Sequence, residues 1–218
     1  MTGAQARLRE EICRIGRSLF ERGYVHASAG NISVRLDDGF LITPTDACLG
    51  FLDPAALARV DGAGVQTGGE RASKTLALHR RIYAADPAAR CVLHTHSTHL
   101  VALTLAGLGG PDSIVPPITP YCVMKVGPVP LLPYRRPGAA ETAADAEQAI
   151  TAARTRGVPI RALMLDRLGP MVWHETPGAA MAVLEELEET ARLCWMTRAA
   201  PLRAAQIDEL RAAFGARW

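Results

Sequence analysis

Apolar residues at helical spacing mark the first element of the chain. Between residues 7 and 21 they recur every three or four positions from Leu8 to Leu19, and Gly23 follows the last of them. This period predicts an amphipathic helix over residues 7–21 that ends before Gly23. Similar patterns predict further helices over residues 76–84, 98–105, 139–154, 178–197 and 204–214.

Short apolar runs between turn residues predict the strands. Residues 31–35 and 40–43 flank the turn Asp37-Asp38-Gly39, which is typical of a hairpin. The proline-rich stretch 109–137 favours strand fragments and loops over a helix. Further strands are predicted over residues 91–94, 161–165 and 171–173. Because strands dominate the middle of the chain and helices flank it, we expect a central sheet with helices on both faces.

Length and composition narrow the class of protein. The chain has 218 residues and a formal net charge of +2, which fits a single domain over residues 1–218. Its basic residues are scattered, so no nucleic-acid partner is expected. Five cysteines without a CxxC pair indicate reduced thiols and a cytoplasmic location. The N-terminus lacks the apolar core of a signal peptide, and no apolar run reaches about 18 residues, so no membrane span is expected.

Two histidines stand at the end of a predicted buried strand. In a strand, residues i and i+2 point to the same face, so His94 and His96 are able to bind one metal ion together. Two ligands are too few for a tight site, so a third ligand would have to come from elsewhere. The alternative is a structural pair of hydrogen-bonded histidines. The other histidines, which are His26, His79, His99 and His174, each fit a packing or surface role.

A turn of small residues precedes the first predicted strand. In Ser28-Ala29-Gly30-Asn31, the glycine leaves backbone N–H groups free to face an anion, and Asn31 adds a side-chain donor. Gly-Asn turns are also common without any ligand, so the pattern fits either an anion site or an ordinary turn.

Several longer motifs follow one another in the order of a known family. They are Ser28-Ala29-Gly30-Asn31-Ile32-Ser33, Leu41-Ile42-Thr43-Pro44-Thr45, Ser73-Lys74-Thr75 with His79 and Tyr83, His94-Thr95-His96-Ser97, Pro120-Tyr121-Cys122-Val123-Met124, Pro133-Tyr134, Pro137-Gly138 and Glu185-Glu186-Leu187-Glu188-Glu189-Thr190-Ala191. Together they resemble the class II aldolase/adducin family, and within it the 3-oxo-tetronate 4-phosphate decarboxylase branch. The resemblance extends from about Leu8 to Trp195.

The resemblance implies a three-layer α/β/α fold with a central, mainly antiparallel sheet. It also implies a zinc ion or similar divalent metal on three histidines, a glutamate acid/base and an enediolate intermediate. Family members are commonly tetramers with four-fold symmetry, so a homotetramer is expected. Carried over to this chain, the first two metal ligands are His94 and His96, and Tyr121 lies in a segment that faces the neighbouring subunit's site. The implied anion contacts are Ser28, Gly30, Asn31, Thr45, Ser73 and Lys74.

Three positions depart from the family pattern. Thr75 stands where the family has its catalytic glutamate, and a threonine hydroxyl is not a general base near neutral pH. Arg167-Leu168-Gly169 stands where the family has an Asn-His-Gly turn, so Leu168 takes the place of the third histidine and cannot coordinate a metal. Asp46 stands in the place of the glycine of a Thr-Gly pair, where its carboxylate would repel a phosphate. These departures indicate a site converted to another function. The alternative is that Asp46 faces away from the site and that Arg167 replaces a lost positive charge.

Two functions of different class remain. In the first, the chain is a divergent lyase that forms an enolate from a small carbonyl substrate, with or without phosphate. There His94 and His96 act as acid/base groups or hold a weakly bound metal, with Thr75, Tyr121 and Asp46 at the same site. In the second, the chain is a non-catalytic oligomeric scaffold, as adducin heads are. An ordinary zinc-dependent sugar-phosphate aldolase or decarboxylase is the remaining alternative.

Overall fold

The structure is a computed structural model that describes residues 3–110 and 112–218. The chain divides into two compact units. The first contains residues 1–96 and 173–181, and the second contains residues 97–172 and 182–218. The single domain predicted over residues 1–218 stays a prediction. In the described part of the chain, no helix combines the length and apolar character that crossing a membrane requires.

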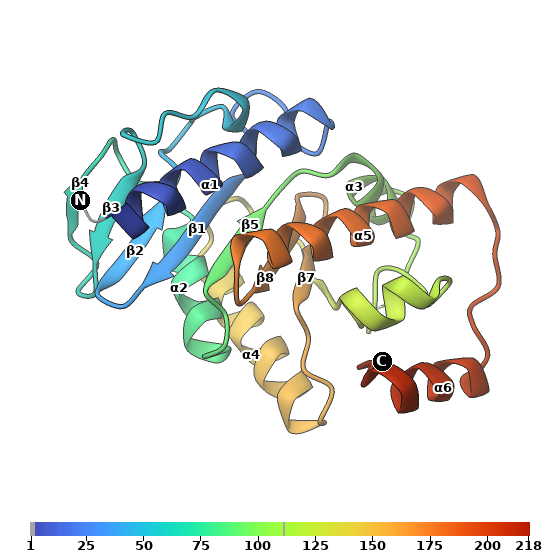
Figure 1. Cartoon of the computed structure of the whole chain (residues 1–218). Coiled ribbons are helices and arrows are strands. Elements are labelled where there is room, and N and C mark those ends of the chain that lie inside the picture. The colour runs from blue at the N-terminus through green and yellow to red at the C-terminus, as the bar shows by residue number, and fades with distance from the viewer. Residues whose placement is uncertain (1–2, 111) are drawn as a thin grey trace. The chain divides into compact units, whose positions relative to one another are not determined.

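Five antiparallel strands form the sheet of the first unit. They are β1 (Asn31–Leu36), β2 (Gly39–Ile42), β3 (Ala58–Asp61), β4 (Gln66–Gly68) and β5 (Cys91–His94), in the order β4-β3-β2-β1-β5 (Figure 1). The predicted strands 31–35, 40–43 and 91–94 are confirmed, whereas β3 and β4 were not predicted. The register pairs Asn31 with His94, so the start of β1 lies beside the end of β5.

The helices of the first unit are α1 (Gly3–Glu21), the short 3-10 helix η1 (Leu49–Phe51) and α2 (Leu76–Ala85). Gly16 lets α1 approach η1 closely, because a Cβ atom there would lie 2.7 Å from the carbonyl oxygen of Leu49. Leu76, the first residue of α2, is buried in a cluster with Ile42, Ala58 and Val60 from the sheet. This packing fixes the start of α2 against β2 and β3.

The second unit contains most of the remaining elements. Its helices are α3 (Thr98–Leu105), α4 (Glu141–Thr155), most of α5 (Pro177–Met196) and α6 (Ala204–Phe214), and one π-helical turn forms η2 (Cys122–Val126). Its strands are β6 (Leu131–Leu132), β7 (Ala162–Leu165) and most of β8 (Gly169–His174); β6 and β7 are parallel, and β7 and β8 are antiparallel. The remaining predicted helices and strands are therefore confirmed to within a few residues.

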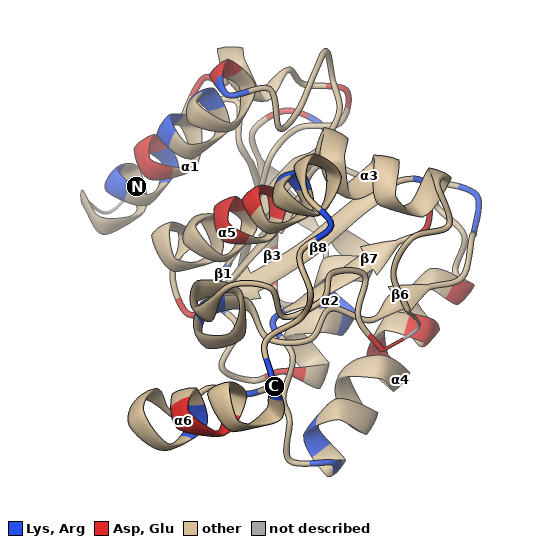
Figure 2. Cartoon of the chain, turned by 90° about the vertical axis from the view of Figure 1, so that its right-hand side faces the viewer, with Lys and Arg blue, Asp and Glu red and all other residues tan. Residues whose placement is uncertain are grey.

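The stretch 109–137 differs in part from its prediction. It contains loops and the short strand β6, as expected, but it also contains the helical turn η2, which was not expected. The prolines flank this turn at Pro120 and Pro128 and do not interrupt it, so they remove none of its hydrogen bonds. Charges are mixed along the elements, and Figure 2 shows basic and acidic residues together on α1 and on α6.

Candidate functional site

The two strand-end histidines lie side by side. The ring centroids of His94 and His96 are 5.1 Å apart, with the rings inclined at 63°. His94 is only 5% exposed, whereas His96 is half-buried. A third imidazole, from His26, lies 6.2 Å from the ring of His96. The only sequence feature that hinted at His26 was its position just before the small-residue turn.

The small-residue turn lies directly against the histidine strand. Gly30 has a φ angle of +84°, a left-handed conformation that glycine adopts easily. A Cβ atom at this position would lie 2.8 Å from the backbone oxygen of His94, so a side chain would force the two segments apart. Glycine is therefore required for Asn31 to begin β1 opposite His94.

Asn31 joins this turn to the segment before α2. Its side-chain Nδ2 donates to Oγ1 of Thr75 at 3.2 Å, and the backbone N–H of Thr75 donates to Oγ of Ser73 at 3.3 Å. Asn31 is 7% exposed, and its Oδ1 has no hydrogen-bond partner among the described residues. The structure thus brings together three of the predicted site residues, with one buried amide atom left unpaired.

The loop after β2 runs beside the segment that contains Ser73. The backbone N–H of Ser73 donates to the carbonyl oxygen of Thr43, and that of Thr45 donates to the carbonyl oxygen of Arg71. Asp46 follows with a φ angle of 58°, in the left-handed region, and its side chain is exposed. Ser28 and Lys74 are exposed as well.

Against β1 lies a buried polar residue that the sequence did not single out for a role. His79 of α2 is fully buried, and its Nδ1 lies 2.7 Å from Oγ of Ser33, which also contacts the hydroxyl of Tyr83 at 2.7 Å. Nε2 of His79 has no partner among the described residues. The signal in the sequence was the spacing of His79 and Tyr83, one helical turn apart, opposite a serine in a strand.

Burial makes two imidazoles of this unit, those of His96 and His79, weaker bases. It lowers the pKa of His96 below the ordinary histidine value, and repulsion from His26 acts in the same direction. Burial also lowers the pKa of His79 to about 3, with a smaller contribution from His94. Both rings are therefore neutral near pH 7, and a neutral imidazole offers one donor and one acceptor nitrogen.

Two further predicted positions belong to the second unit. Tyr121, directly before η2, is 60% exposed. Leu168 lies in the turn between β7 and β8, where Arg167 has a φ angle of 59° and its backbone N–H donates to Oγ1 of Thr104 at 3.1 Å. Tyr121 and Leu168 belong to a different unit from His94 and His96, and their membership of the histidine site stays a prediction.

The residues present do not fit a three-histidine metal centre. Thr75 offers only a hydroxyl, which accepts a hydrogen bond from Asn31, and Leu168 offers no donor atom. Within residues 3–110 and 112–218, no three or more His, Cys, Asp and Glu side chains are grouped as metal ligands would be. The pair His94 and His96 alone matches a weak site at most.

A mainly antiparallel sheet that carries paired histidines beside a Gly-Asn turn defines a protein of the class II aldolase type. The family model described as Class II Aldolase and Adducin N-terminal domain matches residues 10–195, and the chain belongs to this family. The chain is 56% identical to a 3-oxo-tetronate 4-phosphate decarboxylase of Cupriavidus necator, with 98% of this chain and 99% of the relative covered. It is 42% identical to the protein of that name from Escherichia coli, with 94% and 95% covered.

Solved structures confirm the predicted fold. The crystal structure of YgbL from Escherichia coli matches with a TM-score of 0.86 and 39% identity, covering 95% of this chain and 99% of that chain. The L-fuculose-1-phosphate aldolase of Thermus thermophilus matches with a TM-score of 0.73 and 28% identity, covering 91% and 100%. The α/β class II aldolase fold with its mainly antiparallel sheet, predicted from the sequence, is confirmed.

Proposed function

We propose that this chain is a lyase that releases carbon dioxide from a small 3-oxo acid through an enolate. The relatives named 3-oxo-tetronate 4-phosphate decarboxylase support this class of substrate. The observation that carries the proposal is the pair His94 and His96, with ring centroids 5.1 Å apart beside the Gly30-Asn31 turn. Retro-aldol cleavage uses the same enolate chemistry and is a second reaction open to the site.

Loss of carbon dioxide leaves an electron pair on the substrate, and this negative charge has to be stabilised. When a 3-oxo acid loses carbon dioxide, the bond between C1 and C2 breaks, and its electrons form the enolate of C2 and the C3 carbonyl. The neutral ring of His96 donates an N–H hydrogen bond to the enolate oxygen, which stabilises the developing charge. A proton then reaches C2 by way of the histidine pair, and the ketone is released.

The substrate's anionic end is assigned to the turns around Asn31. Ser73, Thr75 and Asn31 form a connected group of polar side chains, and Gly30 leaves backbone N–H groups near it. Lys74, which is exposed, adds a positive charge to the same segment. The carboxylate of Asp46 repels a doubly charged phosphate more than a singly charged carboxylate and attracts a cation, so we infer that a substrate without phosphate, or one with a cationic group, is held as well as a phosphate ester.

No step of this proposal passes through a metal ion. Zinc is the usual cofactor in this family, and here it would have only His94 and His96 as side-chain ligands. Tightly bound, stoichiometric zinc in protein purified without chelator would contradict the proposal. Turnover that survives treatment with a chelator would support it.

The proposal is tested by turnover of 3-oxo-tetronate 4-phosphate and of acetoacetate, which lacks phosphate, with carbon dioxide release as the readout. His96→Ala should lower kcat by roughly 10²- to 10⁴-fold, the usual contribution of a general acid/base group, and should leave the fold intact. His174→Asn is the matched control. Nδ1 of His174 accepts a hydrogen bond from the backbone N–H of the adjacent Glu175, so this variant should retain full activity. Full activity in His96→Ala would remove the histidine pair from the reaction.

A non-catalytic scaffold is the second candidate. It is favoured by the exposed aromatic residues Phe51, Tyr121 and Tyr134, which are 79%, 60% and 61% exposed and would suit contacts between chains. In that case neither substrate would be turned over, while the chain would still assemble into the homotetramer that the family predicts. Sedimentation together with the turnover assay separates the two functions.

A further inference from the structure

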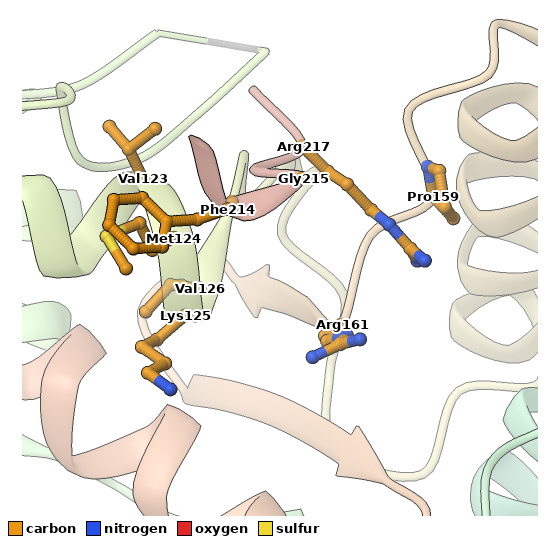
Figure 3. Close-up of a pocket in the computed structure, with 10 residues that line it drawn as sticks. Val123, Met124, Lys125, Val126, Pro159, Arg161, Phe214, Gly215 and Arg217 are labelled. Atoms are coloured by element: carbon orange, nitrogen blue, oxygen red, sulfur yellow. The ribbon is translucent and has the colours of Figure 1, made fainter. Parts of the chain in front are cut away.

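A basic cavity lies in the second unit, apart from the residues assigned to the histidine site. It has a volume of about 290 Å³ and lies between η2, the segment before β7 and the end of α6 (Figure 3). Its lining includes the cations Lys125, Arg161 and Arg217, and among the described residues that line it none is acidic. These three residues are far apart in the sequence, so no run of basic residues predicted a cationic cavity.

The walls of this cavity are held by close packing. Val123 of η2 is buried in a cluster with Ile207 of α6 and with Ala216. Gly127 has a φ angle of 78°, and a Cβ atom there would lie 2.9 Å from the backbone oxygen of Arg217. Glycine at this position therefore lets the last segment of the chain lie against η2, which places Arg217 at the cavity.

The three cations of the cavity suit the anionic groups of a ligand. Figure 3 shows the side chain of Arg217 extending from the C-terminal segment toward Arg161. Two guanidinium groups and the Lys125 ammonium in one lining give the cavity a positive charge, which favours an oxyanion. Arginine binds phosphate and carboxylate through paired N–H donors, which makes the preference specific for planar or tetrahedral oxyanions.

We propose that this cavity binds a small metabolite through its phosphate or carboxylate groups. Met124 and Phe214 line the same cavity and would contact the carbon skeleton of the ligand. The volume lies just below the range of roughly 300–1,000 Å³ for ligand pockets, which suits a compact phosphate ester or tricarboxylate and is too small for a dinucleotide. Binding falls as salt rises, because part of the cavity is open to solvent.

The test is a titration of the full chain, labelled with ¹⁵N, with inorganic phosphate, glycerol 3-phosphate and citrate in turn. We expect saturable shifts of the backbone amide signals of Gly127 and Gly215, which border the cavity. These signals also separate the cavity from any anion bound at the Gly30-Asn31 turn of the first unit. The ligand that binds most tightly decides between a phosphate and a carboxylate source.

Variants decide whether the cations carry the binding. Arg217→Gln and Arg161→Gln should each weaken the affinity by about tenfold or more, as expected for the loss of a charged hydrogen bond. Arg198→Gln, an equal change of charge at an exposed position of the same unit, should leave the affinity unchanged. The proposal would be overturned if all three variants bound the anions as tightly as the wild type. It would also be overturned if none of the three anions shifted the signals of Gly127 and Gly215.

Discussion

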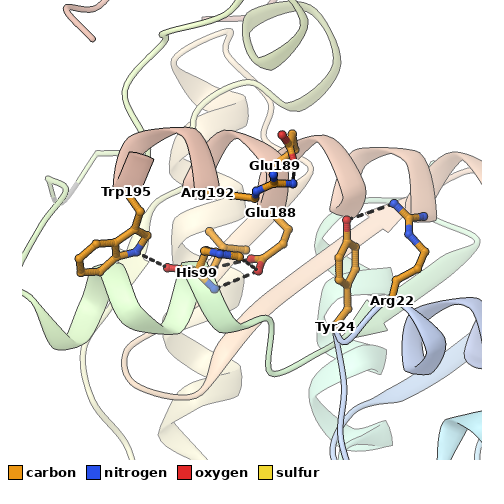
Figure 4. A network of polar contacts seen from close by, with 8 residues as sticks. Arg22, Tyr24, His99, Glu188, Glu189, Arg192 and Trp195 are labelled. Atoms are coloured by element: carbon orange, nitrogen blue, oxygen red, sulfur yellow. Dashed lines mark hydrogen bonds and ion pairs between the residues drawn. The ribbon is translucent and has the colours of Figure 1, made fainter. Parts of the chain in front are cut away.

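Buried polar groups meet at two places in the chain, on α2 in the first unit and at the start of α3 in the second. In the first, His79 and Asn31 are 0% and 7% exposed, and each keeps one side-chain atom without a partner among the described residues. In the second, Glu188 of α5 is 4% exposed, and both of its oxygens accept hydrogen bonds. Figure 4 shows this carboxylate beside His99, with Trp195 on the same helix.

This difference in hydrogen bonding distinguishes a structural cluster from a candidate functional site. An unpaired buried polar atom costs about 1–3 kcal/mol, so it persists where a ligand, a water or a function requires it. Glu188 accepts from the backbone N–H groups of His99 and Leu100 at 2.9 and 3.2 Å, and its Oε1 lies 2.8 Å from Nδ1 of His99. These bonds cap α3. The unpaired atoms of the first unit instead lie beside the strand pair that ends in His94.

The largest stability effect is expected at the satisfied cluster. Glu188→Ala should lower the free energy of unfolding by about 3 kcal/mol, because it leaves the first N–H groups of α3 without their buried acceptor. Denaturation by urea measures this. Glu189→Ala is the control, since Glu189 is half-exposed and its ion pair with Arg192 at 3.3 Å should contribute less than about 1 kcal/mol. Similar losses in both variants would contradict the assignment of Glu188 as the cap.

Hydrophobic periodicity predicted most elements because their apolar faces are buried. The helix over 7–21 and the strand over 91–94 are examples, since each buries a regular set of side chains. By contrast, β4 (Gln66–Gly68) is exposed along its whole length and therefore carries no apolar pattern. The π-helical turn of η2 is too short for a period to appear, and flanking prolines suggested a loop.

The site was predictable only as far as local spacing reaches. The rings of His94 and His96 lie close together, as their spacing predicted, although β5 ends at His94 and His96 lies two residues beyond the strand. The bond from Asn31 to Thr75 joins residues 44 positions apart and depends on how the loops fold. Family resemblance placed both residues at one site, but spacing alone could not. For His79 the sequence left a packing and a surface role open, and its full burial agrees with the packing role.

The second-largest effect is the pH dependence of the free energy of unfolding that comes from His79 in the first unit. Because the pKa of His79 is lowered to about 3 by burial, the folded state holds its ring neutral, while the unfolded chain binds a proton below about pH 6.5. The stabilisation is complete above pH 6.5 and is lost as the pH falls toward 3. At pH 5 the loss is about 2 kcal/mol relative to pH 7.5.

Removing the imidazole sharpens this test. In His79→Gln the difference in unfolding free energy between pH 7.5 and pH 5 should be smaller by about 2 kcal/mol than in the wild type, whatever the variant's absolute stability. Oγ of Ser33 contacts this ring directly, and His94 is the one charged or titratable neighbour that contributes to its lowered pKa among the described residues. An unchanged pH dependence would mean that His79 is not held neutral in the folded chain.

The smallest effect concerns the backbone at two positions that depart from the family pattern. Asp46 in the first unit and Arg167 in the second have φ angles of 58° and 59°, the left-handed region. Both stand where the resemblance implies residues suited to that region, a glycine and an asparagine. The left-handed backbone of this chain at both positions agrees with the residues that the resemblance implies there.

Asp46→Gly should consequently change the unfolding free energy by less than about 1 kcal/mol, because glycine adopts this conformation without strain but is more flexible when unfolded. Asp46→Val, which places a β-branched residue at the same φ, should destabilise the chain by more than Asp46→Gly does. Thermal unfolding of both variants measures the difference. The glycine variant should also bind phosphate esters more tightly than the wild type, since it removes a carboxylate from the anion site. If Asp46→Val were as stable as Asp46→Gly, the left-handed backbone at this position would be wrong, and with it the alignment that identifies the altered anion site.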